Sequence, residues 1–147
     1  MSLQILVDET IERRKGDKIK TKGVFRDAVR SSRKKVVHCY GLRWVAMMLL
    51  VPVPWSSRPW ALPFFTVQVP SEKTCRKLGK PHKSVIDRVC LGLRLVQRWI
   101  PQRALILVGD GAYAALELIR FCRSLPNPVT LVARFRWNAA LYDAPPA

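Results

Sequence analysis

Three short runs of apolar residues predict strands. Residues 3–8 and 104–109 place Ile, Leu and Val side by side with no helical spacing, and residues 129–133 form a further run of this kind. A strand that is apolar along its length is usually buried in the middle of a sheet. We therefore expect the first two runs to lie in the interior of one sheet.

Two longer segments carry apolar residues at helical spacing. The first begins at Ser84, whose hydroxyl can cap the first turn, and Asp87 favours the positive end of the helix dipole. Pro101 ends this run. The second helix is expected over residues 112–125, where Pro126 closes it.

Residues 36–69 are rich in β-branched and aromatic residues and contain a turn-rich break at residues 55–59. This pattern predicts two or three antiparallel strands. Proline cannot donate a hydrogen bond to a strand ladder, so prolines should lie at strand ends or on an edge. The prolines concerned are Pro52, Pro54, Pro59 and Pro63.

The order of these elements is strand, hairpin strands, helix, strand, helix and strand, which predicts an α/β domain with a mixed sheet. A length of 147 residues fits one domain, and a hydrophobic fraction of 49% argues against disorder. The longest apolar run, residues 44–53, is interrupted by Pro52 and is far too short for a membrane span. The chain begins directly with a strand rather than a signal peptide, so a cytoplasmic location is expected.

The formal net charge is +16, and a positive field of this size attracts polyanions. Residues 13–35 contain eleven Lys or Arg, so we expect a solvated loop that can contact phosphate. Arg13, Arg14 and Lys15 are its first candidates for DNA binding. Residues 71–83 form a second basic loop.

Asp8 ends the first apolar run, and Asp110 follows the second between two glycines. If these strands are adjacent and parallel, the two carboxylates face one another across a strand spacing of roughly 4.8 Å. Carboxylates that close repel unless a cation neutralises them, and hard oxygen ligands favour Mg²⁺ or Mn²⁺. The pair is a candidate for metal-assisted phosphodiester chemistry. A turn or helix-cap role is the alternative.

Several segments, taken in order along the chain, carry a resemblance to a known family. They are the strand that ends in Asp8, Gly41–Leu42–Arg43–Trp44, Arg58–Pro59–Trp60–Ala61–Leu62–Pro63, Gly109–Asp110–Gly111–Ala112–Tyr113, and residues 132–142. Together they resemble the DDE transposases of bacterial insertion sequences, which are RNase H-like nucleases. Residues 109–113 are similar to the second-aspartate motif of that family, with an aromatic residue three positions after the aspartate.

The resemblance implies an RNase H-like fold, in which antiparallel hairpin strands are followed by parallel strands and flanking helices. It makes Asp8 the first and Asp110 the second catalytic, metal-binding aspartate, with two Mg²⁺ or Mn²⁺ ions in the full-length family. The implied reaction is DNA transposition by cleavage and strand transfer. The implied partner is DNA, with a homo-oligomer on the DNA ends, a nucleoid-associated location, no membrane and no small-molecule cofactor.

The third acidic residue of the family has no counterpart in this sequence. Glu117 follows Tyr113 too closely, and Asp143 is interpreted as a loop residue. We therefore expect residues 1–147 to be a single, incomplete RNase H-like catalytic domain, truncated at the C-terminus and inactive alone. Arg134 and Arg136 are further candidates for contacting the phosphate backbone. The competing interpretation is a non-catalytic basic module that binds nucleic acid.

Overall fold

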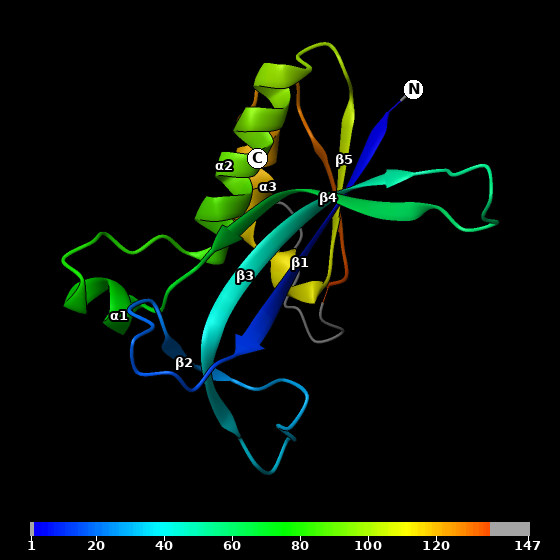
Figure 1. Ribbon diagram of the computed structural model, residues 1–147. Helices are drawn as coiled ribbons and strands as arrows, with labels where there is room; N and C mark the ends of the chain where they lie inside the picture. Colours follow the sequence, from blue (N-terminus) through cyan, green and yellow to red (C-terminus); the bar gives the residue numbers. More distant parts are fainter. Residues whose placement is uncertain (1, 136–147) are drawn as a thin grey trace, which may run out of the picture.

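A computed structural model describes residues 2–135, which form a six-stranded mixed sheet with helices packed against it (Figure 1). The elements are β1 (Leu3–Arg13), β2 (Gly23–Arg26), β3 (His38–Val51), β4 (Trp60–Gln68), α1 (Glu72–Lys77), α2 (Val85–Trp99), β5 (Leu105–Gly109), the 3-10 turn η1 (Gly111–Tyr113), α3 (Leu116–Ser124) and β6 (Thr130–Ala133). The predicted α/β fold with a mixed sheet is confirmed, and the arrangement is consistent with an RNase H-like fold.

Strand β1 lies between the antiparallel and the parallel halves of the sheet. It pairs antiparallel with β3 and parallel with β5, while β5 pairs parallel with β6. Residues 36–69 form two long strands, because β3 and β4 pair as an antiparallel hairpin. Pro63 lies in β4, whose described ladder partner is β3, beside a register shift at Met47 and Met48. This position fits a residue that cannot donate to a ladder on both sides.

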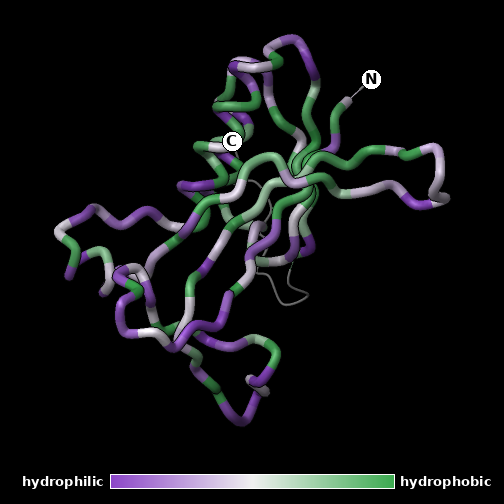
Figure 2. The backbone as a smooth tube through the Cα atoms, viewed as in Figure 1, coloured by the Kyte–Doolittle hydropathy of each residue, from purple (hydrophilic) through white to green (hydrophobic). Residues whose placement is uncertain are grey.

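The core lies on one face of the sheet, beneath α2 and α3. Alternate residues of the central strands point into it: Ile5, Val7, Val45, Met47, Leu105 and Leu107. The helices add Val89, Leu93, Val96, Leu118 and Cys122. In Figure 2, hydrophobic residues are frequent along the strands of the upper half, and hydrophilic residues are frequent in the lower loops. Each fully buried Val, Leu or Ile side chain stabilises the fold by about 1.5–3 kcal/mol.

Helix α2 begins as the sequence predicts. The backbone N–H of Asp87 donates to the Ser84 hydroxyl over 3.1 Å, and the backbone N–H of Ser84 donates to the Asp87 carboxylate over 2.7 Å. This reciprocal capping satisfies two N–H groups that the first helical turn leaves free. The bond from the Ser84 backbone also holds the pKa of Asp87 below its usual value.

Strand β1 is longer than the apolar run predicts. It continues from Asp8 to Arg13, because β3 supplies backbone partners for residues 5 to 13. Pairing with β5 runs only from Leu3 to Leu6. Asp8 therefore lies within β1, although it is just past the last residue that pairs with β5.

Both basic stretches contain ordered elements that the sequence interpretation missed. Residues 13–35 include β2, which pairs with the first residues of β3 and buries Phe25. Residues 71–83 include α1, which Ser71 caps by accepting from the backbone N–H of Thr74. The many charged side chains hide these elements, because lysine and arginine project into water from a regular backbone as readily as from a loop.

The second predicted helix begins later than expected. Residues 111–113 form η1 instead, and α3 starts at Leu116. Asp110 caps η1 and Tyr113 is buried, so the chain turns inward before it resumes as a helix. None of the helices within residues 2–135 combines the length and hydropathy that crossing a membrane requires.

Candidate functional site

The parallel pairing of β1 with β5 sets Asp8 and Asp110 at one level of the sheet. Leu3 pairs with Leu105 and Leu6 pairs with Val108, an offset of 102 residues. Asp8 and Asp110 are separated by the same 102 residues, two positions beyond the last pair. Paired residues of parallel strands carry their side chains on the same face. The adjacent, parallel arrangement of the two strands that the metal hypothesis assumes is therefore present.

Each aspartate is exposed and uses one carboxylate oxygen within the chain. Asp8 Oδ1 accepts from the backbone N–H of Glu9 over 2.8 Å. Asp110 Oδ1 accepts from the backbone N–H of Ala112 over 2.9 Å and so caps η1. The cap role that the sequence offered as an alternative is thus real for Asp110. In each aspartate, the second carboxylate oxygen accepts no hydrogen bond from residues 2–135.

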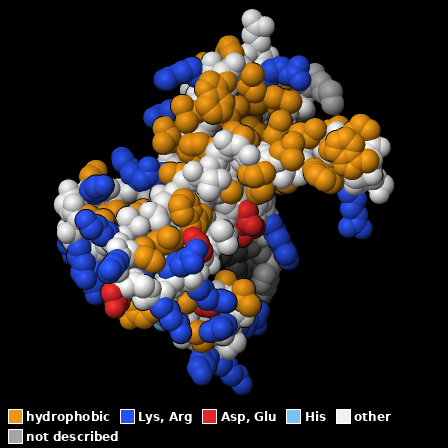
Figure 3. Space-filling model, in the orientation of Figure 1, with side chains coloured by type: hydrophobic (Ala, Val, Ile, Leu, Met, Phe, Trp, Pro, Cys, Tyr) orange, Lys and Arg blue, Asp and Glu red, His pale blue; other side chains and the backbone are white. Residues whose placement is uncertain are grey.

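Asp8 and Asp110 line one cavity of about 570 Å³. The cavity opens along the part of β1 that extends beyond the end of β5, and Arg13, Arg26 and Arg43 contribute to its wall. The cavity is therefore lined by both carboxylates and guanidinium groups. In Figure 3, acidic side chains lie near a central hollow, and Lys and Arg dominate the lower half of the molecule.

A second cavity of about 580 Å³ lies between the C-terminal parts of α2 and α3. Arg94, Phe121 and Pro126 belong to its lining, in which residues 2–135 place no Asp, Glu, His or Cys. Without a carboxylate, the described part of its lining offers no anionic oxygen for a hard cation. We therefore place the candidate site at the two aspartates.

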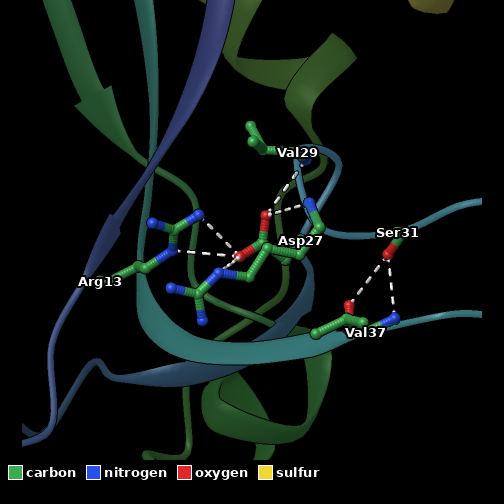
Figure 4. A network of polar contacts seen from close by, with 6 residues as sticks. Arg13, Asp27, Val29, Ser31 and Val37 are labelled. Carbon is green, nitrogen blue, oxygen red and sulfur yellow. Dashed lines mark hydrogen bonds and ion pairs between the residues drawn. The ribbon is translucent and has the colours of Figure 1, made fainter.

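The buried Asp27 forms an ion pair with the half-exposed Arg13 at the edge of the first cavity (Figure 4). It is 3% exposed and accepts from Nε and Nη2 of Arg13 over 3.1 and 2.8 Å. The backbone N–H groups of Val29 and Arg30 donate to its other oxygen. Burial by itself would raise the pKa of Asp27, but these hydrogen bonds, led by that from Arg30, hold the pKa below its usual value.

The sequence interpretation did not single out Asp27, and so missed its role. In the structure, the buried Gly23, Phe25 and Asp27 alternate with exposed residues, as in a half-buried strand. The sequence carries no matching signal, because one of the exposed residues is the apolar Val24. Asp27 fixes the guanidinium of Arg13 at the cavity. Arg13 remains a DNA-binding candidate, although its positive charge is already paired with the Asp27 carboxylate.

The remaining basic candidates lie in different surroundings. Arg14 forms an ion pair with Glu12, and Lys15 is exposed in the loop after β1. Arg134 is exposed and directly follows β6. Because Ala133 pairs with Gly109, Arg134 lies at the same level of the sheet as Asp110, on the neighbouring strand side. Arg136 lies outside the described residues, as does Asp143.

Two further polar groups beside the site are buried without a hydrogen-bond partner among residues 2–135: Nε of Arg43 and the hydroxyl of Tyr113. Arg43 Nε lies 3.9 Å from a carboxylate oxygen of Glu9, too far for a hydrogen bond. Burial, and after it the charges of Glu9, Asp8 and Asp110, raise the pKa of Tyr113. The sequence indicated an aromatic residue at position 113, but not that its side chain would be buried in the core with its hydroxyl.

The donor set fits one hard cation. Mg²⁺ is commonly bound by one or two carboxylates and otherwise by water and substrate phosphates. Asp8 and Asp110 supply such a pair, each with a free oxygen. Within residues 2–135, no group of three or more His, Cys, Asp or Glu residues could hold a metal ion. The residues described do not provide the third carboxylate that the DDE pattern requires.

No protein-family model and no curated protein matches this chain. Among solved structures, it is similar to a chain in the cryo-EM structure of a piggyBac transposase synaptic complex with hairpin DNA, with 13% sequence identity and a TM-score of 0.43. The similarity covers 92% of this chain and 23% of that chain.

Proposed function

We propose that this chain is a catalytic segment of a DDE-type DNA transposase, in which Asp8 and Asp110 bind a Mg²⁺ or Mn²⁺ ion beside a DNA phosphodiester. The observation that supports the proposal most directly is the shared level of the two carboxylates on adjacent parallel strands, within one cavity. The ordered sequence motifs supply the reaction class, which is cleavage of DNA and transfer of the freed 3′-hydroxyl end.

The residues of the cavity have complementary roles in this proposal. Asp8 supplies an anionic oxygen from β1, and Asp110 supplies one from the position directly after β5. Arg26 and Arg43 supply positive charge near the phosphate. Asp27 holds the guanidinium of Arg13 in place. A bound divalent cation would assist the attacking oxygen and stabilise the leaving oxygen of the phosphodiester.

We infer that the chain alone does not turn over. Two ions need more ligands than Asp8 and Asp110 provide, so both ions would not be fixed in the geometry that in-line displacement requires. A nicking assay with Mg²⁺ and plasmid DNA should therefore show no cleavage. Robust cleavage that Asp110→Asn abolishes would contradict this inference and show that these 147 residues contain the whole site.

A thermal-unfolding titration tests cation binding directly. A ligand that binds the folded state raises the midpoint by linkage, so Mn²⁺ should raise the midpoint of the full chain. Asp8→Asn and Asp110→Asn should each remove the increase. Asp17→Asn is the matched control, because Asp17 is a fully exposed carboxylate in the loop after β1. An equal increase in all four proteins would refute a site at the aspartates.

The net charge of +16 favours a second candidate, a basic module that binds DNA without cleaving it. Such binding weakens with salt in proportion to the number of phosphates neutralised, with a logarithmic slope of about −0.9 per phosphate. This candidate predicts DNA binding that Asp8→Ala does not weaken and no response of the thermal midpoint to Mn²⁺. Removal of an Mn²⁺ response by Asp8→Ala would favour the metal site instead.

A further inference from the structure

The two basic stretches carry most of the charge of the chain. Residues 13–35 contain eleven Lys or Arg and two Asp, and residues 71–83 contain five Lys or Arg and one Glu. Together they hold +13 of the formal net charge of +16. The positive charge is therefore concentrated in two segments of the sequence, and charge of this density attracts a phosphate backbone.

The structure brings these two stretches together at the start of β2 (Figure 1). The buried Thr74 of α1 donates from Oγ1 to the carbonyl oxygen of Lys22 over 3.2 Å. Nζ of Lys22 donates to the carbonyl oxygen of Gly16 over 3.0 Å, which ties the loop after β1 to the same point. Beside this joint, a Cβ on Gly23 would come within 3.1 Å of the Ser71 hydroxyl. Residues 13–35 and 71–83 thus form one basic surface.

The lysines in and after α1 remain in solvent when the helix docks. Lys73, Lys77 and Lys80 are exposed, and no ion pair within residues 2–135 involves them. Arg76, by contrast, pairs with Glu72 over 3.1 Å. The three lysines therefore supply the uncompensated charge at this end of the basic surface.

The basic surface continues to the cavity of the two aspartates. Strand β2 begins at Gly23, beside α1, and ends at Arg26, which lines the cavity. Its four residues span about 10 Å, well within one helical turn of DNA, about 34 Å. Figure 3 shows Lys and Arg side chains across this lower half of the molecule. A duplex with one phosphodiester at the cavity can therefore reach α1.

The composition of the basic surface favours a duplex over a single strand. Proteins that bind single strands stack the bases on exposed aromatic rings. Residues 13–35 and 71–83 contain a single Phe, Tyr or Trp, which is Phe25, and its side chain is buried. Charge without exposed rings suits contacts to the phosphates of a duplex, which fix its position without reading bases.

We propose that the basic surface binds duplex DNA through its phosphate backbone, on one flank of the phosphodiester at the cavity, with Lys73, Lys77 and Lys80 contacting phosphates. Thr74 holds α1 against the loop after β1, so that both stretches face the same duplex. This proposal rests on the proposed function for the choice of DNA and for the place of the phosphodiester.

The experiment measures binding of the full chain to a fluorescent DNA duplex of two helical turns, about 20 base pairs, by anisotropy over a range of salt concentrations. The variant Lys73→Gln/Lys77→Gln/Lys80→Gln removes three exposed charges. The slope of log affinity against log salt should become shallower by about 2–3, because each phosphate contact contributes about 0.9. Its thermal midpoint without DNA should match that of the wild type.

The matched control is Arg98→Gln/Arg103→Gln/Arg123→Gln, which removes the same charge from exposed positions in α2, the loop before β5 and α3. The control should keep the wild-type slope. Equal changes of slope in the two triple variants, or an unchanged slope in the lysine variant, would overturn the proposal. Tighter binding of the wild type to single-stranded DNA or to duplex RNA of the same length would overturn the choice of duplex DNA.

The proposed function and the basic surface are tested by separate readouts. The lysine variant should keep the wild-type response of the thermal midpoint to Mn²⁺, because none of its three positions lines the cavity. An absent Mn²⁺ response in the wild type would refute the metal site, whereas the slopes of the two triple variants decide the role of the basic surface.

Discussion

Leu6 lies opposite Val108 in the parallel ladder of β1 and β5, and this pairing sets the level at which Asp8 and Asp110 meet. Because the register offset equals the separation of the two aspartates, a slip of one residue would move Asp8 to the other face of the sheet. The buried side chains of Ile5, Val7 and Leu107 prevent such a slip, since it would expose them. The core thus holds the site in register.

Neutralising one aspartate should relieve repulsion without disturbing the fold. Asp110→Asn keeps an oxygen that can accept from Ala112, so the cap of η1 is retained. In metal-free, low-salt buffer, Asp8→Asn and Asp110→Asn should leave the free energy of unfolding unchanged or raise it by up to about 1 kcal/mol, the scale of exposed charge pairs. Denaturant unfolding measures this. A loss of several kcal/mol would mean that the carboxylates are structural.

Removing the charge of Asp27 should destabilise the fold in a pH-dependent way. The pKa of Asp27 is lowered in the folded chain, so its contribution is complete above the unfolded-state pKa, about 3.9 for Asp, and is lost as pH falls through the folded-state pKa. Asp27→Asn should therefore unfold more readily than the wild type at pH 7, and the difference should shrink below about pH 4.

Chemical denaturation at pH 7 and at intervals down to pH 3 measures this difference. Asp17→Asn again serves as the control, because Asp17 is fully exposed and should show little difference at any pH. A difference between Asp27→Asn and the wild type that stays constant down to pH 3 would contradict the ionised pair with Arg13.

Gly41 should not tolerate a side chain. It pairs with Arg13 on one side of β3 and with Gly23 on the other, and an added Cβ would collide with the carbonyl oxygen of Glu12. Gly41→Ala should lower the free energy of unfolding by about 1–3 kcal/mol, the typical cost of inserting an extra carbon into a well-packed site. In the control Gly16→Ala, the new Cβ meets only the Ile19 side chain at ordinary contact distance, and stability should hardly change.

The cap of α2 should contribute measurably to stability. Ser84→Ala removes the acceptor for the backbone N–H of Asp87 and should lower the free energy of unfolding by about 1 kcal/mol. Ser57→Ala, an exposed position in the turn between β3 and β4, should have little effect. Equal unfolding midpoints for the two variants would show that other interactions hold the start of the helix.

The elements with local signals follow from the sequence alone. The apolar runs of β1, β5 and β6, the capped start of α2 and the positions of Asp8 and Asp110 could be predicted because each depends on neighbouring residues alone. The α/β order followed from them. The identity of the two candidate ligands therefore required no tertiary information, although their binding of a cation stays a prediction.

The remaining features depend on tertiary contacts, because distant backbone and side-chain partners override local patterns. Strand β1 extends to Arg13 because β3 supplies its partners, and Arg13 meets Asp27 only through the turn after β2. The start of α3 is delayed because Tyr113 turns inward against Gly109. Contacts between residues far apart in sequence produce no periodic pattern of apolar residues. For this reason the sequence did not reveal that the basic stretch, expected to be a solvated loop, forms part of the cavity wall.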